Sequence, residues 1–340
     1  GPKGSGQFER ITWDEALDEI VGKWKAIIKE YGPQAIMPYS YLGHQGLVHG
    51  LNGADAFFNK MGATVCERTF CGEGSCTAWL TTVGPTAGLD VESYIHSKYI
   101  VLWACNSVST NLHHWPIVQD ARKNGAKVVV IDSYKSRTAK EADWHICPKP
   151  GTDGALAMAI INSIIEQGLV DKDYVDNYTV GYDELAERAK TRTPEWAAEI
   201  TGVAAEDICQ LAKDLATEQP AAIRMGVALE RHFGGGQTIR AVTCIPGLTG
   251  AWRHVGGGIT QFPVWEHPYK FDIICRPDFI PEGTRVINAL QIGRALTGEM
   301  DLDIPIKSMM FWNANPVTQS PETDKIVAGL MDEDLFMVCA

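Results

Sequence analysis

Apolar runs of strand length alternate with amphipathic segments of helix length along most of the chain. The clearest example lies between residues 98 and 132. Residues 98–106 form an apolar run, residues 114–124 carry apolar side chains on one helical face, and residues 127–132 form a β-branched run. A strand, a helix and a second strand at this spacing predict two parallel strands joined by a right-handed crossover. We therefore expect an α/β fold with mostly parallel sheets.

The same patterns predict the other elements. Thr12 and Glu15 form a capping-box motif, which predicts a helix that starts there and ends at Gly32-Pro33. Further strands are expected at 35–41, 144–148, 221–227, 308–312 and 335–340. Further helices are expected at 54–61, 75–83, 151–167, 205–216, 237–248, 288–296 and 322–331. Residues 260–283, rich in proline and aromatic residues, are expected to form a long loop, and long loops in compact domains are often functional.

Polar residues follow several of the expected strands, at 106–110, 132–137, 152–153 and 313–316. In open α/β sheets, ligands bind outside the carboxyl ends of the strands. Small hydroxyl side chains, an amide and a helix N-terminus suit phosphate, and an acid at a strand end suits a ribose or a base. The pattern therefore predicts a nucleotide-shaped site. A flavodoxin-like domain with no bound ligand remains an alternative, because the fingerprint G-x-G-x-x-G is missing.

Composition narrows the class of protein. The 340 residues, 45% hydrophobic and 21% charged, predict one large or two ordinary globular domains. A net charge of −12 argues against a nucleic-acid partner, and no apolar run reaches membrane-spanning length. The nine cysteines are an odd number, and six of them stand singly, where buried thiols are expected: Cys105, Cys147, Cys209, Cys244, Cys275 and Cys339. The other three, Cys66, Cys71 and Cys76, share one loop.

Six short motifs, each weak alone, occur in a characteristic order: 10–17, 103–106, 137–143, 150–153, 249–258 and 313–316. Together they resemble the bis-molybdopterin guanine dinucleotide enzymes, the dimethyl-sulfoxide-reductase superfamily. The resemblance implies a central fragment of the catalytic subunit, without the amino-terminal iron–sulfur domain and the carboxy-terminal barrel. It also implies two α/β domains facing each other across the cofactor. A Rossmann-like domain, 67–251, would be inserted within a discontinuous one, 1–66 with 252–340.

The resemblance also implies which residues contact a molybdenum or tungsten bis(molybdopterin guanine dinucleotide) cofactor. One guanine dinucleotide tail would be held by residues in three loops: Trp103, Cys105, Asn106, Ser107, Thr110, Asp132, Ser133, Lys135, Thr152 and Asp153. Met225, Glu230 and Asn315 are expected along the cofactor as well. Relatives often carry Gln near Glu230.

By the same resemblance, Cys71 is the expected metal ligand, because relatives place a Cys, selenocysteine, Ser or Asp in this loop. A thiolate is a soft, charged donor that suits such a metal. Cys76 and Cys66 are alternative ligands. Two other interpretations do not make these cysteines ligands of that metal. All three could be buried thiols at a turn, or all three could bind an iron–sulfur cluster, although such a cluster would lack a fourth nearby ligand.

Other polar side chains are candidates for acid–base roles near the metal. Glu73 and His44 are the expected catalytic residues, and His113, His114 and His254 are further candidates; surface or structural roles are the alternative for each. Formate oxidation is not favoured. Formate dehydrogenases follow the metal ligand with His, where this chain has Gly72, and residues 258–263 lack the expected Arg.

The resemblance therefore implies a molybdopterin-dependent oxidoreductase that moves two electrons, often with an oxygen atom, to or from a small substrate. An iron–sulfur electron-transfer subunit is the expected partner, and a 4Fe–4S cluster is expected only in the missing amino-terminal domain. The isolated piece is expected to be inactive. Two alternatives remain open: a non-redox hydratase of the same family, and a metal-free scaffold resembling the large iron–sulfur subunit of respiratory complex I.

Overall fold

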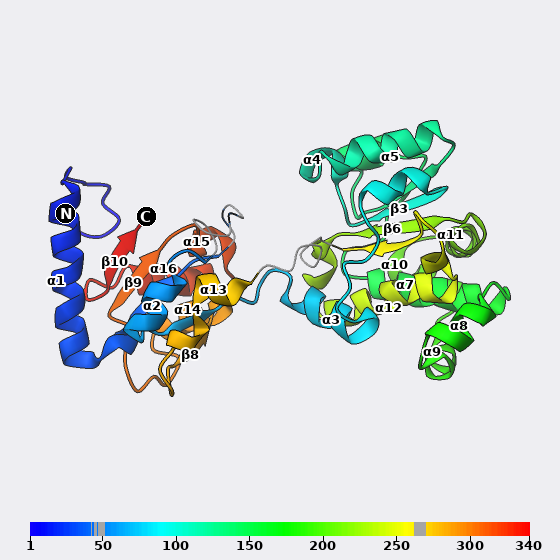
Figure 1. Ribbon diagram of the computed structural model, residues 1–340. Coiled ribbons are helices and arrows are strands. Elements are labelled where there is room, and N and C mark those ends of the chain that lie inside the picture. The colour runs from blue at the N-terminus through cyan, green and yellow to red at the C-terminus, as the bar shows by residue number, and fades with distance from the viewer. Residues whose placement is uncertain (42, 44–45, 47–51, 262–269) are drawn as a thin grey trace. The chain divides into compact units, whose positions relative to one another are not determined.

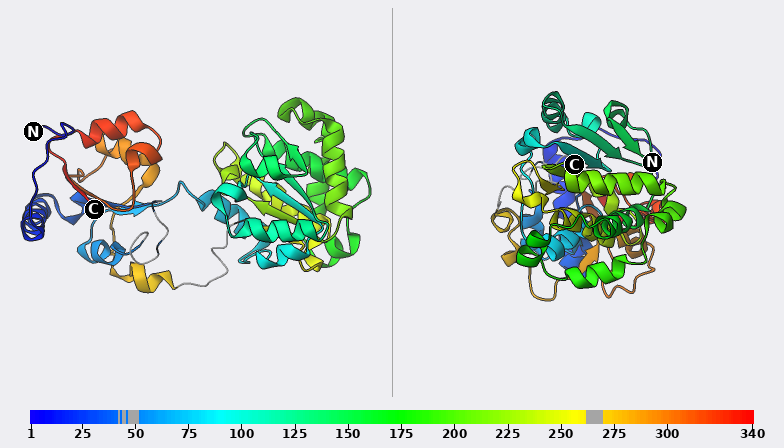
Figure 2. Two further views of the ribbon diagram at one scale, coloured as in Figure 1. Left: turned by 90° about the horizontal axis from the view of Figure 1, so that it is seen from above. Right: turned by 90° about the vertical axis from the view of Figure 1, so that its right-hand side faces the viewer.

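The chain forms two compact units, and the residues of one interrupt the sequence of the other (Figures 1 and 2). The computed structural model describes residues 1–41, 43, 46, 52–261 and 270–340. The outer unit comprises Gly1–Cys71 with Tyr269–Ala340, and the inserted unit comprises Gly72–Pro268. These boundaries differ from the expected 66/67 and 251/252. Strand β7 (Gly258–Thr260) pairs with β6 (Ala221–Met225), so this later segment belongs to the inserted unit.

A five-stranded parallel sheet organises the inserted unit, in the order β5-β4-β3-β6-β7. The strands β3 (Tyr99–Trp103), β4 (Lys127–Ile131) and β5 (Trp144–Ile146) run from the centre to one edge, whereas β6 and β7 lie on the other side of β3. The strand order therefore reverses next to β3. A crevice forms at such a switch point, outside the carboxyl ends of the strands.

Both faces of this sheet are covered, which explains the continuous apolar runs of its central strands. Figure 1 shows α5 (His114–Lys123) on one face and α7 (Asp153–Glu166) with α12 (Gly235–Leu248) on the other. Leu102 packs toward α5, and Val101 toward α7 and α12. The unit's other α-helices are α3 (Glu73–Val83), α4 (Ser107–Thr110), α6 (Arg137–Glu141), α8 (Lys172–Tyr178), α9 (Tyr182–Ala189), α10 (Pro194–Thr201) and α11 (Ala205–Thr217), with 3-10 turns η3 (Glu92–His96), η4 (Val227–Glu230) and η5 (Ala251–Arg253).

The outer unit contains a three-stranded parallel sheet, β1 (Ile36–Tyr39), β9 (Ser308–Phe311) and β10 (Phe336–Cys339), with β9 in the middle. Helices α1 (Trp13–Tyr31) and α2 (Asp55–Met61) pack against one face, and α14 (Ile292–Leu296) and α16 (Thr323–Leu330) against the other. The buried Trp24 indole on α1 donates a 2.9 Å hydrogen bond to Ser308 Oγ. A two-stranded parallel sheet, β2 (Val65–Glu67) with β8 (Val286–Asn288), and the short helices α13 (Phe271–Cys275) and α15 (Pro316–Gln319) complete the described elements, with 3-10 turns η1 (Pro33–Ala35), η6 (Pro277–Phe279) and η7 (Ala289–Gln291).

Several expectations can be compared with this fold. The α/β class with parallel sheets is confirmed, as is the capping box of Thr12 and Glu15. The three-residue strands β2, β7 and β8 were not predicted, because so short a run shows no alternation. The expected loop 260–283 contains α13 and η6, and residues 262–269 lie outside the described part of the chain. Within the described residues, no helix combines the length and apolar character needed to cross a membrane.

The expectation that the six singly placed cysteines are buried was wrong for two of them. Cys147 and Cys339 are exposed, whereas Cys105 is buried and the other three are half-buried. Cys147 follows β5 in the chain, and Cys339 ends the strand β10. Both strands form an edge of their sheet, where apolar sequence neighbours do not ensure a covering layer.

Candidate functional site

A cleft opens in the inserted unit at the carboxyl ends of strands β3, β4, β5 and β6. Its volume is about 390 Å³, within the roughly 300–1,000 Å³ of typical ligand pockets. The residues that line it end β4, follow one of these strands in the chain or begin α7: Ala104, Asn106, Thr110, Ile131, Asp132, Ser133, Tyr134, Pro148, Pro150, Gly151, Asp153, Ala228, Leu229 and His232. The cleft therefore lies at the switch point of the sheet.

Close packing of two strand ends forms the base of this cleft. Ala104, directly after β3, has a φ of 52°, and Gly226 follows β6. A Cβ at Gly226 would lie 1.9 Å from the Ala104 carbonyl oxygen, so only glycine fits there. The Gly226 amide also donates a 2.8 Å hydrogen bond to the Trp103 carbonyl. The left-handed turn at Ala104 and the missing side chain at Gly226 together allow the ends of β3 and β6 to approach each other this closely.

Asn106 is held in place by neighbouring polar groups. Thr138 Oγ1 donates a 2.6 Å hydrogen bond to Asn106 Oδ1, and Asn106 Nδ2 donates to the Tyr134 hydroxyl at 3.2 Å. The Val108 amide in α4 donates to Thr138 Oγ1 at 3.0 Å. These bonds connect the loop after β3 to the loop after β4, so both present their polar atoms to the cleft in one arrangement.

Two carboxylates face the cleft, from Asp132 and Asp153. Asp153, the first residue of α7, accepts a 2.8 Å hydrogen bond at Oδ1 from the fully buried Trp103 indole. Asp132 is half-buried. Burial raises its pKa, while hydrogen bonds from the backbone of Tyr134 and Ser133 act in the opposite direction. The cleft thus offers hydrogen-bond acceptors on two loops, and none of the described residues that line it is Lys or Arg.

The residues expected to hold a nucleotide tail fall into three groups. Five line the cleft: Asn106, Thr110, Asp132, Ser133 and Asp153. Three are buried: Trp103, Cys105 and Ser107. Met225, which was expected along the cofactor and not at the tail, is buried too. Lys135 is exposed outside the lining, and the Thr152 hydroxyl donates a 2.6 Å hydrogen bond to the Lys149 carbonyl. The individual predictions did not include Tyr134, Gly151 and His232, although each lies beside a predicted residue or on a strand end.

Cys71, the expected metal ligand, lies two residues before helix α3. Cys71 is half-buried, and its carbonyl accepts a 2.7 Å hydrogen bond from the Tyr41 hydroxyl. The Tyr41 ring meets the Phe70 ring edge-on, with centroids 4.7 Å apart. Gly72 has a φ of 82° and is the N-cap of α3. A glycine is favoured at this turn because L side chains rarely adopt that conformation.

The expectation that Cys66, Cys71 and Cys76 share one loop was wrong for two of them, which lie in regular secondary structure. Cys66 is buried in β2, and burial raises the pKa of its thiol to about 12, so the thiol stays neutral. Cys76 is half-buried within α3. The described residues contain no group of three or more His, Cys, Asp or Glu side chains arranged to hold a metal ion. Cys66, Cys71 and Cys76 therefore do not converge on a cluster site.

The remaining predicted residues are dispersed. Glu73 is exposed on the first turn of α3, and His44 lies outside the described residues. Asn315 lies in the outer unit, where its backbone amide donates to Gln319 Oε1 at 2.8 Å. Glu230 is engaged elsewhere: its buried carboxylate accepts hydrogen bonds from the backbone of Gly72 and Ser75. This contact was not predicted, and the sequence contains no local signal for it.

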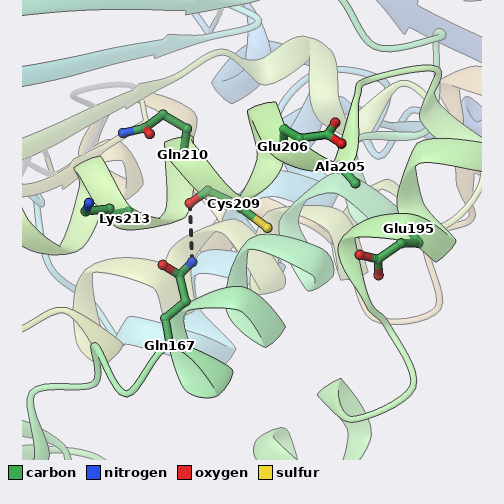
Figure 3. A pocket seen from close by; sticks show the side chains of 7 residues that line it. All are labelled: Gln167, Glu195, Ala205, Glu206, Cys209, Gln210 and Lys213. Atoms are coloured by element: carbon green, nitrogen blue, oxygen red, sulfur yellow. Dashed lines mark hydrogen bonds between the residues drawn. The ribbon is translucent and has the colours of Figure 1, made fainter.

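A second hollow of about 320 Å³ lies among helices of the inserted unit (Figure 3). Its residues come from α10, α11 and the end of α7: Gln167, Glu195, Ala205, Glu206, Cys209, Gln210 and Lys213. Gln167 Nε2 donates hydrogen bonds to Ser163 Oγ and to the Cys209 carbonyl. None of these residues follows a strand, and the polar side chains of the hollow include both signs of charge. The cleft at the strand ends is therefore the stronger candidate for function.

Comparison with known proteins gives a consistent result. A sequence profile described as "Molybdopterin oxidoreductase" matches residues 3–340. The chain is 41% identical over 339 residues to "Probable oxidoreductase YoaE" of Bacillus subtilis, covering 99% of this chain and 49% of that protein. It is 30% identical to "Dimethyl sulfoxide reductase DmsA" of Escherichia coli, covering 92% and 43%. The structure of "Acetylene Hydratase from Pelobacter acetylenicus" matches with a TM-score of 0.78 and 25% identity, covering 99% and 51%. The chain thus spans about half the length of the relatives it matches.

Proposed function

Because the chain belongs to the molybdopterin oxidoreductase family, we propose that it forms the central cofactor-binding part of a molybdenum or tungsten oxidoreductase. The proposed cofactor is bis(molybdopterin guanine dinucleotide). The proposed reaction transfers two electrons, with or without an oxygen atom, to or from a small substrate. The observation that carries the proposal is the cleft at the carboxyl ends of β3 to β6, with its two carboxylates.

The cleft suits a guanylyl group in size and in hydrogen-bonding chemistry. The Watson–Crick edge of guanine presents N–H donors, which a carboxylate accepts at two oxygens. Asp132 and Asp153 supply such acceptors, and the indole of Trp103 orients Asp153. The Ser133 and Thr110 hydroxyls, with the Asn106 amide, suit ribose and phosphate oxygens. Since no Lys or Arg is among the described lining residues, we propose that phosphate recognition relies on hydroxyl and backbone N–H donors.

We propose Cys71 as the only protein ligand to the metal. Its thiolate would be a soft donor beside the dithiolene sulfurs of the pterins, and the structure provides no competing cluster of ligands among the described residues. The Tyr41 hydroxyl and the turn at Gly72 fix the backbone on both sides of this cysteine. The bound metal and pterin would supply the redox chemistry. The chain would position them and set the charge of the ligand.

A second function within the same family is a hydratase without net redox. It is supported by the structural likeness to acetylene hydratase. Electron exchange with a viologen dye distinguishes the two functions. An oxidoreductase reduces or oxidises the dye with its substrate, whereas a hydratase that contains the metal does not. For the oxidoreductase we also propose an iron–sulfur protein as electron-transfer partner, and a 4Fe–4S cluster in a part of the polypeptide outside these residues.

The test measures cofactor content directly. The protein is produced within its complete polypeptide in a host that makes the cofactor, and its molybdenum, tungsten and acid-released guanine nucleotide are quantified by mass spectrometry. We expect one metal and bound guanine nucleotide in the parent. Asp132→Ala should lower nucleotide retention during dialysis by roughly tenfold to a hundredfold, the loss expected for a hydrogen bond to a charged group.

The matched control is Asp120→Ala. Asp120 is a half-exposed carboxylate on α5 whose partner is Lys123, away from the cleft lining. This variant should retain nucleotide like the parent. A parent protein with neither metal nor guanine nucleotide contradicts the proposal. Equal loss in the Asp120 and Asp132 variants contradicts the assignment of the cleft.

A further inference from the structure

The carboxylate of Glu230 binds the N-terminus of helix α3. Its Oε1 accepts a 2.5 Å hydrogen bond from the Gly72 amide, and its Oε2 accepts a 2.8 Å hydrogen bond from the Ser75 amide. The side chain is only 6% exposed. Both oxygens are therefore bonded to backbone amides at the start of an 11-residue helix, one at its N-cap Gly72 and one in its first turn. Gly72 is the residue directly after Cys71.

Helix α3 needs this distant partner because its own N-cap provides none. Ser, Thr, Asp or Asn at the N-cap would normally accept from an amide of the first turn. Gly72 has no side chain that could accept such a bond, and its left-handed conformation disfavours Ser or Thr at this position. A carboxylate also interacts favourably with the positive end of the helix dipole. Glu230 thus supplies the capping acceptor that the residues next to the start of α3 do not provide.

Close packing of the neighbouring backbone segments holds Glu230 beside the start of α3. Glu230 ends the 3-10 turn η4, and Gly235 begins α12, which packs along α3. A Cβ at Gly235 would lie 2.5 Å from the Glu230 carbonyl oxygen, so the two segments approach as closely as glycine allows. A Cβ at Gly74 would lie 3.5 Å from Glu230 Oε2, an ordinary contact. The carboxylate is enclosed between α3 and α12.

We propose that Glu230 is a positioning residue that fixes the turn carrying Cys71, and that it makes no direct contact with the cofactor. The inference rests on the proposed function, in which Cys71 is the metal ligand. Rotating the carboxylate toward a ligand would leave two buried backbone amides without their acceptor, which is costly. The Glu230 carboxylate, bonded to the Gly72 and Ser75 amides, sets the direction in which the chain leaves Cys71. It thereby sets the direction from which the Cys71 thiolate approaches the metal.

The first measurement is hydrogen exchange of the α3 amides. Glu230→Gln keeps the volume and one acceptor oxygen but places an NH₂ group against an amide donor, and Glu230→Ala removes both acceptors. We expect exchange in residues 72–76 to accelerate roughly tenfold in Glu230→Gln, and more in Glu230→Ala. Exchange in the strand β3 should not change. The matched control is Glu206→Gln, an exposed carboxylate in the first turn of α11 for which the structure shows no cap bond (Figure 3).

The second measurement is X-ray absorption at the metal edge of the cofactor-loaded protein. A merely structural role would leave the metal–sulfur coordination unchanged. Positioning predicts that Glu230→Gln alters the metal–thiolate distance or occupancy at the parent's metal content, while Glu206→Gln does not. Parent-like exchange in Glu230→Ala, or a parent-like spectrum in Glu230→Gln, would overturn the inference. A Cys71→Ser protein with the parent's spectrum would refute the ligand assignment instead, so the two failures can be told apart.

Discussion

The buried imidazole of His114 should make the stability of the inserted unit depend on pH. Its side chain is fully buried, its Nδ1 lies 3.2 Å from Ser107 Oγ, and its ring meets Tyr94 edge-on at 4.7 Å. Burial lowers the pKa of His114 from 6.5 to about 4, and the nearby Arg224 cation acts in the same direction. The folded protein therefore holds this imidazole neutral at a pH where the unfolded chain protonates it.

The sign and size follow from proton linkage. A lowered pKa in the folded state means that the unfolded state binds more protons between pH 4 and 6.5. The stabilisation is complete above the unfolded pKa and is lost as pH falls through this window. Its upper limit is about 3.4 kcal/mol, from about 2.5 pKa units at about 1.36 kcal/mol each. Between about pH 7.5 and about pH 5, the linkage relation predicts a loss of about 2 kcal/mol.

The assay compares urea unfolding of the parent and of His114→Gln at both pH values. His114→Gln should be less stable at neutral pH, because its side chain packs differently against Tyr94, but it should lack the pH-dependent part. The difference between the two pH dependences isolates His114, since all other titrating groups are shared. His96→Gln, at an exposed histidine on η3, is the control and should keep the parent's pH dependence. If parent and His114→Gln lose the same free energy on acidification, the reasoning is refuted.

Three further predictions concern stability and the cleft. Thr12→Ala removes a complete capping box with Glu15 and should lower the free energy of unfolding by roughly 0.5–2 kcal/mol in denaturant titration; no change would show that α1 does not depend on its cap. Ile160→Ala in the fully buried part of α7 should cost roughly 2–5 kcal/mol, and a cost below about 1 kcal/mol would contradict the packing described. Trp103→Phe removes the hydrogen bond to Asp153 and should weaken guanine nucleotide retention, measured by dialysis and mass spectrometry, while Asp120→Ala retention serves as the reference.

Much of the fold could be predicted from local patterns. The strands β3 and β4, the helices α5 and α7 and the capping box follow from periodicity and cap chemistry within a few residues. The three-residue strands β2, β7 and β8 were missed, because pairing partners far along the chain decide whether so short a run becomes a strand. The pairing of β7 with β6 also places the later boundary of the inserted unit beyond the expected one. The exposure of Cys147 and Cys339 was missed for a similar reason: edge position is a property of the sheet and not of the strand's own sequence.

The sequence predicted at which edge of the sheet the candidate site lies, but it did not predict which side chains face the cleft. Polar residues after parallel strands must meet at one edge of a sheet, so Asn106, Asp132 and Asp153 were predicted together and lie together. Which neighbours face the cleft could not be predicted, because turn geometry rotates each side chain. Ser107 turns inward toward His114, whereas Tyr134 turns toward Asn106 and the cleft.

The sequence by itself determined the order of the elements, the parallel α/β class and the edge of the sheet at which the cleft opens, since these depend on periodicity and on chain direction. Only the tertiary structure decided that the Glu230 carboxylate accepts a hydrogen bond from the Ser75 amide at the start of α3. These two residues are 155 positions apart in the sequence. The physical reason is that a buried carboxylate must find donors wherever folding brings them, and no local pattern encodes that meeting. The same holds for the neutral state of His114, which depends on burial and on Arg224.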